Sequence, residues 1–184
     1  RKGIDNNPNS DQIAKLKLLC DNILQPVRDH FGPVVVTSCY RSPELSVAIG
    51  SSAGYQNQDS SSVAIGPYAG YQDQSFNSVA IGSHAGNQSQ SENSVAIGQE
   101  AGRTDQSNNT IAIGFQAGGE KQSYKAVSIG YQAGKFRQDA SAVAVGPGAG
   151  WRDQSYNAVA VGSGAGNQNQ GHSSVAVGRR AGHI

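Results

Sequence analysis

Ser78-Val79-Ala80-Ile81-Gly82 is the stretch of this sequence that decides the fold. The pentapeptide, or a close variant, starts at positions 46, 62, 78, 94, 110, 126, 142, 158 and 174, every 16 residues, with no insertion or deletion between copies. It opens eight full units and a truncated ninth, and we count unit positions from Ser46 as position 1. A period this short and strict predicts stacked coils of backbone in which each unit packs only on its neighbours. The repeat favours a structural or adhesive protein over an enzyme.

Several positions of the unit never vary. Position 5 is Gly in all nine copies, beginning with Gly50, Gly66 and Gly82, and positions 8 and 9 are always Ala-Gly. Positions 2 and 4 are always Val or Ile. Position 13 is Gln in all eight full units: Gln58, Gln74, Gln90, Gln106, Gln122, Gln138, Gln154 and Gln170. We expect the invariant positions to form the interior and the turns, and the variable positions to face solvent.

Local chemistry indicates strands joined by tight turns. Val47 and Ile49 alternate with Ala48, a period of two that is typical of a strand. Gly50 and Gly54 disfavour a helix and suit turns that need positive φ. We therefore predict an all-β fold over residues 46–184, a parallel β-solenoid or β-roll with one coil per unit. Coils stacked at about 4.8 Å would form a rod roughly 40 Å long.

The recurring Gln has two interpretations. Its amide can bond the amides one coil above and below, which would make an internal ladder. Alternatively, it is only a polar turn residue. A solvated turn would not hold one residue type through eight copies, so the ladder is the favoured reading.

The apolar content of each unit is small. Val, Ile and two Ala bury little area against a backbone entropy cost of about 1–2 kcal/mol per ordered residue. If Ala and Gly line a narrow interior, the Val/Ile stripe faces outward and another chain must cover it. The opposite arrangement, with the aliphatic residues inside, would permit a monomer. The poor core favours self-association.

The run Asn77-Ser78-Val79-Ala80-Ile81-Gly82-Ser83, repeated from Asn93, resembles the head repeats of trimeric autotransporter adhesins. Similar repeats occur in phage and large-virus fibre proteins. The resemblance covers residues 46–184 and implies a parallel β-roll that assembles as a homotrimer. The 16-residue spacing and the Ala-Gly-x-x-x-Gln segment are longer than the usual adhesin unit.

The first 45 residues contain no repeat and hold both cysteines, Cys20 and Cys39. Apolar residues at helical spacing between Ile13 and Phe31 predict a helix, and residues 34–38 predict a short buried strand. We expect a small α/β segment before the repeats. The two cysteines form either one disulfide or two separate thiols, and their spacing does not decide between these states.

Residues 24–32, followed by Val34-Val-Val-Thr-Ser-Cys-Tyr-Arg-Ser-Pro-Glu-Leu45, resemble the N-terminal part of zinc D-Ala-D-Ala carboxypeptidases, a family common among phage peptidoglycan peptidases. The resemblance covers residues 4–50. Cys39 replaces a glycine of the family pattern, and Arg41 matches the family's substrate-binding arginine. At Leu45-Ser46 the chain changes to the repeat pattern, through either a recombination event or an error of sequence assembly.

The resembled family binds zinc through Ser-x-His-x-x-Gly-x-Ala-x-Asp and a later His, with a catalytic Glu. None of His30, His84, His172 and His183 is followed by Asp seven residues later. A zinc peptidase needs three protein ligands and an open position for water. We therefore expect no enzyme activity, no cofactor and no metal, and we expect Arg41 to be a surface or capping residue.

Charge and composition exclude other classes. Residues 46–184 carry eight basic and eight acidic side chains, without the basic excess of a nucleic-acid surface. No apolar run is long enough to span a membrane. The Gly-Gly-x-Gly-x-Asp of calcium-binding rolls and the Thr arrays of ice-binding solenoids are absent. Arg1 is not an initiator Met and the ninth unit stops short, so we expect a fragment of a longer protein.

Large aromatic residues occupy variable positions 10 and 15. These are Tyr55, Tyr71, Trp151, Phe76, Tyr124 and Tyr156. Exposed aromatics beside Gln and Asn suit a glycan or protein receptor through stacking and adaptable hydrogen bonds. The alternative is that neighbours such as Tyr55 and Tyr71 stack only to shield the coil edges.

Together these observations predict a self-associating module of a cell-surface, extracellular or virion fibre, with a lateral binding surface for a host glycan or protein receptor. The alternative is a fragment of a zinc-dependent peptidoglycan peptidase fused to a repeat region. A longer sequence containing His-x-x-Gly-x-Ala-x-Asp would favour that alternative.

Overall fold

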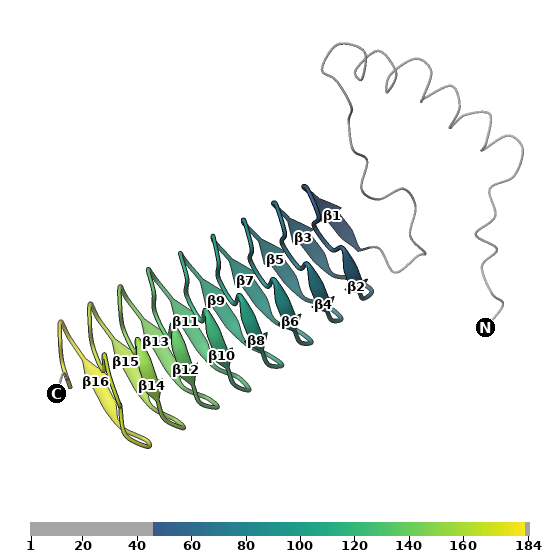
Figure 1. The fold of residues 1–184 in the computed structure, drawn as a ribbon. Helices are drawn as coiled ribbons and strands as arrows, with labels where there is room; N and C mark the ends of the chain where they lie inside the picture. Colours follow the sequence, from purple (N-terminus) through teal and green to yellow (C-terminus); the bar gives the residue numbers. More distant parts are fainter. Residues whose placement is uncertain (1–45, 183–184) are drawn as a thin grey trace, which may run out of the picture. The chain divides into compact units, whose positions relative to one another are not determined.

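The structure, a computed structural model, describes residues 46–182. These residues form the predicted parallel β-solenoid (Figure 1). The α/β segment expected over residues 1–45, with Cys20, Cys39 and Arg41, lies outside the described residues, as does His183.

The Val-x-Ile strands form one nine-stranded sheet, in which each strand pairs with the strand one coil further. Its strands are β1 (Val47–Ile49), β3 (Val63–Ile65), β5 (Val79–Ile81), β7 (Val95–Ile97), β9 (Ile111–Ile113), β11 (Val127–Ile129), β13 (Val143–Val145), β15 (Val159–Val161) and β16 (Val175–Val177). Every pair is parallel and offset by one unit, as in Val47 opposite Val63. The sequence repeat is therefore the structural repeat.

Positions 11–13 form the second sheet, which has seven strands. Its strands are β2 (Gln56–Gln58), β4 (Gln72–Gln74), β6 (Gln88–Gln90), β8 (Thr104–Gln106), β10 (Glu120–Gln122), β12 (Phe136–Gln138) and β14 (Arg152–Gln154). Gln168 continues this sheet only as an isolated bridge to Arg152. Each of the first seven coils contributes one strand to each sheet, and the interior lies between the two sheets.

The turns depend on left-handed backbone. Position 16 has positive φ in every complete coil and is Asn in four of them, such as Asn77 and Asn93. Asn tolerates this conformation better than most residues. Position 12 also has positive φ, in the middle of each second-sheet strand, even where it is Lys121 or Arg137. The alternation of side chains between the two faces, which a regular strand would show, is therefore interrupted at position 12.

Position 5 requires glycine for two reasons. Gly98 has a φ of +125°, and a Cβ atom built on it would lie 2.7 Å from the carbonyl oxygen of Gly114, one coil further. L-residues rarely adopt this conformation, and the neighbour is backbone that cannot rotate away. Consecutive coils therefore make their closest approach along the column of position-5 glycines.

Alanine alone supplies the buried apolar side chains among residues 46–182. Positions 3 and 8 provide most of them, for example Ala80 and Ala85, both fully buried. The largest fully buried side chains are glutamines of position 13, such as Gln122 and Gln138. The interior is therefore a narrow column of methyl groups beside a column of amides.

Val and Ile of positions 2 and 4 point away from this interior. Most are half-buried; the exposed fraction is 36% at Ile113 and rises to 58% at Ile49 and 70% at Val175, which lie in the end coils. Of the two arrangements that the sequence left open, the structure has the one with Ala inside and the aliphatic stripe outside. We call the outward side chains of positions 2 and 4 the Val/Ile face.

Candidate functional site

The position-13 amides connect the two sheets within a coil and connect each coil to the next. Gln138 Nε2 donates to the carbonyl oxygen of Val127 in its own coil, at 3.0 Å, and to Oε1 of Gln154 in the next coil, at 2.9 Å. A buried polar group is tolerated only when its hydrogen bonds are made. These glutamines therefore have a structural role, and they are not accessible to a ligand.

The amide column is not equally bonded along its length. Links between successive glutamines join Gln58 to Gln74 and then run without a break from Gln106 to Gln170. Between these stretches, the buried Oε1 atoms of Gln90 and Gln106 have no hydrogen-bond partner within residues 46–182. The third and fourth coils therefore carry the weakest part of the column.

The Val/Ile face is the largest regular feature of the outer surface. It runs across all nine strands of the first sheet, from Val47 to Val177. Neighbouring strands pair in register, so each Val lies beside the position-2 residue of the next coil and each Ile beside the position-4 residue. The result is a continuous aliphatic surface.

Four aromatic rings gather on the first three coils. Tyr55 and Tyr71 stack with ring centroids 5.2 Å apart and planes within 8° of parallel. Tyr68 contacts both Tyr71 and His84, at centroid distances of 5.5 and 5.0 Å. Tyr55 keeps 62% of its surface exposed. The cluster is compatible with both interpretations of these aromatics, shielding of the coil edges and receptor binding, because the rings cover one another and still present an aromatic surface.

Trp151 belongs to a different group. Its ring meets Phe136 of the preceding coil edge-on, at 5.2 Å, and the Arg152 guanidinium lies 4.9 Å from the Trp151 centroid. Trp151 is half-buried, so position 10 is less open than the sequence suggested. The structure does not bring Trp151 together with Tyr55 and Tyr71.

The aromatics of position 15 stand apart from one another. Phe76, Tyr124 and Tyr156 are 46%, 48% and 44% exposed. Tyr156 contacts His172, and Lys125 Nζ lies 4.9 Å above the Tyr124 ring. Phe76 and Tyr124 are three coils apart, about 14 Å along the rod. These residues therefore form separate exposed points rather than one site.

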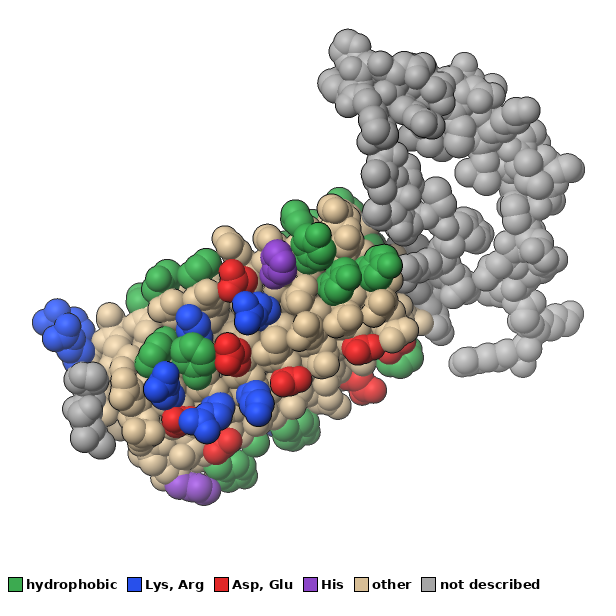
Figure 2. All heavy atoms as spheres, viewed as in Figure 1, with side chains coloured by type: hydrophobic (Ala, Val, Ile, Leu, Met, Phe, Trp, Pro, Cys, Tyr) green, Lys and Arg blue, Asp and Glu red, His purple; other side chains and the backbone are tan. Residues whose placement is uncertain are grey.

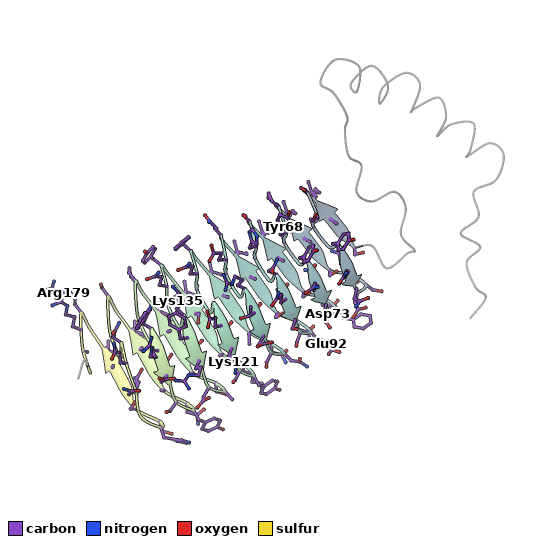
Figure 3. The ribbon with its side chains drawn as sticks, viewed as in Figure 1. Tyr68, Asp73, Glu92, Lys121, Lys135 and Arg179 are labelled. Carbon is purple, nitrogen blue, oxygen red and sulfur yellow. The ribbon has the colours of Figure 1, made fainter. Side chains whose placement is uncertain are left out.

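Sequence reasoning missed four aromatics, among them Phe136 at position 11, and one charged surface. Tyr68 occupies position 7, and Phe115 and Tyr131 stack at position 6, at 5.4 Å. Figure 2 shows charged side chains gathered on one face over the middle and later coils, and Figure 3 places Lys121 and Lys135 there. Aligning the units by position would have revealed this pair, because Phe115 and Tyr131 occupy position 6 in two successive units.

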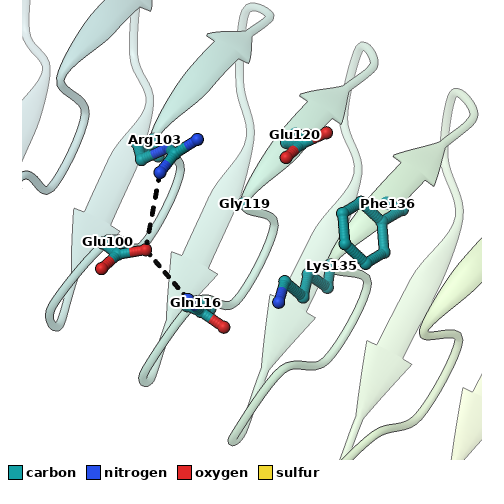
Figure 4. A pocket seen from close by; sticks show the side chains of 7 residues that line it. All are labelled: Glu100, Arg103, Gln116, Gly119, Glu120, Lys135 and Phe136. Atoms are coloured by element: carbon teal, nitrogen blue, oxygen red, sulfur yellow. Dashed lines mark hydrogen bonds and ion pairs between the residues drawn. The ribbon is translucent and has the colours of Figure 1, made fainter.

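Two hollows lie within this charged surface. The first has a volume of about 120 Å³ and surrounds Gly119 (Figure 4). The second has a volume of about 280 Å³ and is rimmed by Lys121, Arg137 and Arg152. Glu120 and Phe136 line both, so the hollows adjoin. Both hollows combine charged groups with an aromatic wall.

Within residues 46–182, no group of three or more His, Cys, Asp and Glu side chains is placed to hold a metal ion. A search of the same part of the chain found no helix with the length and hydrophobicity to cross a bilayer. Comparison of the chain with protein-family models, with curated proteins and with solved structures gives no match.

Proposed function

We propose that this chain is a structural and adhesive module of a cell-surface, extracellular or virion fibre. In this proposal its copies associate through the Val/Ile face and present the remaining lateral surface to a receptor. The observation that carries the proposal is the pairing of a continuous aliphatic face with an interior whose buried apolar side chains are all alanine.

Physical chemistry supports this use of the Val/Ile face. Soluble monomers rarely expose contiguous apolar patches larger than a few hundred Å². Covering this face would bury branched side chains, each contributing on the order of 1.5–3 kcal/mol when fully removed from water. The alanine interior gives far less per residue. A second and a third copy of the chain fit the face, because the strand register repeats identically in each copy.

Three is the number implied by the resemblance to trimeric adhesin heads. A closed trimer places the Val/Ile faces around one axis, so no aliphatic face remains open to further addition. The second sheet, with the aromatic and charged groups, would then face outward. We propose that the resembled peptidase segment at the N-terminus is inactive and that the repeats carry the function.

The mass of the chain in solution tests this proposal. One chain has a mass of 19.0 kDa. Light scattering at micromolar concentration should give about three times this value, with circular dichroism typical of β structure. A folded monomer would overturn the self-association. A spectrum dominated by helix would overturn the fold.

Paired substitutions locate the interface. Ile113→Glu with Ile129→Lys places opposite charges on neighbouring strands of the Val/Ile face, where they attract each other but exclude an apolar partner. We expect a folded monomer. The matched control, Gln88→Glu with Thr104→Lys, makes the same change on neighbouring strands of the second sheet and should leave the mass unchanged. Equal loss of association in both variants would assign the interface elsewhere.

A further inference from the structure

The hollow at Gly119 arises from one missing side chain. In the other seven full units, position 10 carries Tyr, Asn, Arg, Lys or Trp. Gly119 contributes none: its backbone is buried beneath the stem of Lys135, whose Cγ lies 3.7 Å from where a Cβ would stand, and the hollow lies around it between Arg103 and Lys135 (Figure 4). An enclosed cavity of about 150 Å³ holds a benzene ring. The hollow of about 120 Å³ is smaller than that cavity but opens to solvent, so a six-membered ring can enter it in part.

The fold itself does not require glycine here. Gly119 lies outside the positive-φ region, and an added Cβ atom would come no closer than 3.3 Å to its nearest neighbour, the carbonyl oxygen of Gln116. Asn occupies the same position in two other coils and bonds there to backbone: Asn87 Nδ2 donates to the Tyr68 carbonyl oxygen at 3.0 Å, and Asn167 Nδ2 to that of Gly148 at 3.2 Å. The hollow is thus a feature of this coil and not a consequence of the repeat.

The lining of the first hollow suits a hydroxylated ring. Glu100 pairs with Arg103 at 3.7 Å and accepts a hydrogen bond from Gln116 at 2.9 Å, so these three side chains hold one another in place. Glu120 has no ion pair within the described residues and presents an acceptor. Phe136 supplies an apolar wall. Hydroxyl groups can donate to the carboxylates, and a ring face can pack against Phe136.

Cations dominate the adjoining hollow. Lys121 and Arg152 have no ion pair within the described residues, while Arg137 pairs with Asp153 at 2.6 Å. Lys135, which lines the first hollow, has its Nζ 4.9 Å above the Phe136 ring and is likewise without an ion pair in this part of the chain. In the first hollow Glu100 and Glu120 are balanced by Arg103 and Lys135. In the second hollow the three cations outnumber the one carboxylate, Glu120, so an acidic group is favoured there.

We propose that the two hollows form one binding site for a carboxylated glycan. A sugar ring occupies the Gly119 hollow, and a carboxylate of a neighbouring sugar lies over Lys121 and Arg152. The site extends over four coils, about 14 Å along the rod. Backbone hydrogen bonds between coils hold its floor, as where Glu120 N donates to the Lys135 carbonyl oxygen at 2.9 Å. This proposal rests on the lateral surface of the proposed function and names its ligand class.

Other polyanions fit this surface less well. An acidic peptide would find the cations but would leave the ring-sized hollow unfilled, and its carboxylates would meet Glu100 and Glu120. A nucleic acid binds through many phosphate contacts. Here the acidic side chains among the cations oppose that mode, and the repeat region carries as many acidic as basic residues.

Calorimetric titration with tetragalacturonate, using the full chain in its native assembly, tests the site. We expect saturable binding that the methyl-esterified tetramer reproduces at least about tenfold more weakly. Gly119→Asn fills the hollow with a side chain that this position accepts elsewhere, and it should weaken binding by at least about tenfold. Arg152→Gln should weaken binding while the esterified tetramer is little affected. The matched control Asn87→Gly opens position 10 two coils away and should change nothing.

Three results would overturn the inference. The first is that the folded protein does not bind tetragalacturonate. The second is that the Gly119→Asn variant binds it as tightly as the unchanged protein. The third is that tetraglutamate binds as tightly as tetragalacturonate, which would indicate charge attraction alone. Molecular mass is measured separately. An assembled trimer that binds no acidic glycan would therefore overturn this inference and leave the self-association standing.

Discussion

The side-chain amide of Gln138 donates to that of Gln154, one coil further, at 2.9 Å, and both side chains are almost fully buried. The same Gln138 Nε2 also donates to the Val127 carbonyl oxygen across the interior. One residue type therefore performs two tasks, joining the sheets within a coil and joining the coils to one another. An interior that offers only alanine methyl groups depends on these bonds for its specificity.

Removing a fully bonded amide should cost more than removing a partly bonded one. Gln122 donates to the Ile111 carbonyl oxygen, Ser128 Oγ and Gln138 Oε1, and accepts from Gln106. Gln90 donates only to backbone, and its Oε1 has no partner in the described region. We expect Gln122→Leu to lower the free energy of unfolding by about 3 kcal/mol, and Gln90→Leu by about 1 kcal/mol less. Urea denaturation measures both, and equal losses would contradict a cooperative ladder.

Two glycines should respond very differently to a methyl group. Gly98→Ala places Cβ at 2.7 Å from the Gly114 carbonyl oxygen in a conformation with φ of +125°, so we expect a loss above about 3 kcal/mol. Gly119→Ala meets nothing closer than 3.3 Å and should change stability by about 1 kcal/mol or less. Thermal unfolding of the two variants side by side checks this. A mild effect at Gly98 would mean that the coils can separate locally.

Lysine is a poor residue for the left-handed conformation it adopts in β10. Lys121 has a φ of 55°, where Asn and Gly are favoured over other residues. Lys121→Asn should therefore raise the free energy of unfolding by about 1 kcal/mol. Gln99→Asn, an exposed position whose φ is not positive, is the control and should stay within about 0.5 kcal/mol. A destabilised Lys121→Asn variant would show that the lysine makes a contact that outweighs its backbone strain.

Substitutions at the stacked pair Tyr55 and Tyr71 can show whether these rings shield the coil edges or bind a receptor. A double-mutant cycle to Ala should give a coupling energy of about 0.5–1.5 kcal/mol if the stack stabilises the coil edges. If the rings serve a receptor instead, the coupling should be near zero while binding to receptor-bearing surfaces falls. Denaturation and surface-binding measurements on the same four proteins separate these outcomes. A loss of stability with unchanged binding per folded molecule would exclude recognition.

The chain is expected to bind no stoichiometric zinc and to leave D-Ala-D-Ala peptides uncleaved, because no histidine has the His-to-Asp spacing of the resembled peptidases. Elemental analysis of the purified protein measures the first expectation, and peptide hydrolysis the second. One tightly held equivalent of zinc, or turnover abolished by Arg41→Ala, would show that other residues complete a metal site.

The repeat made the coil predictable, because a strict 16-residue period with invariant glycines leaves few other folds. Which face of the Val-x-Ile strand points inward could not be decided from composition, since Val79 and Ala80 both suit an interior. Positive φ at Lys121 and Arg137 had no signal in those two residues themselves; its signal lay in the position-12 column, where five of the eight residues are Asn or Asp. The proposed glycan site could not be predicted either: it joins Gly119 of one coil to Phe136 of the next, and their proximity depends on the stacking. Its one visible signal was a glycine in the position-10 column.

The identical register of neighbouring coils has a consequence for how such a protein changes in length. Excising residues 158–173 would join Asn157 directly to Ser174, and position 16 would again be followed by position 1. At the invariant positions, every residue would meet the same residue type that it already contacts. A deletion or duplication of one 16-residue unit in the gene would therefore shorten or lengthen the rod by about 4.8 Å and keep the coil-to-coil register. In the proposed fibre, length and ligand specificity could then evolve independently, because the two hollows occupy only four of the coils.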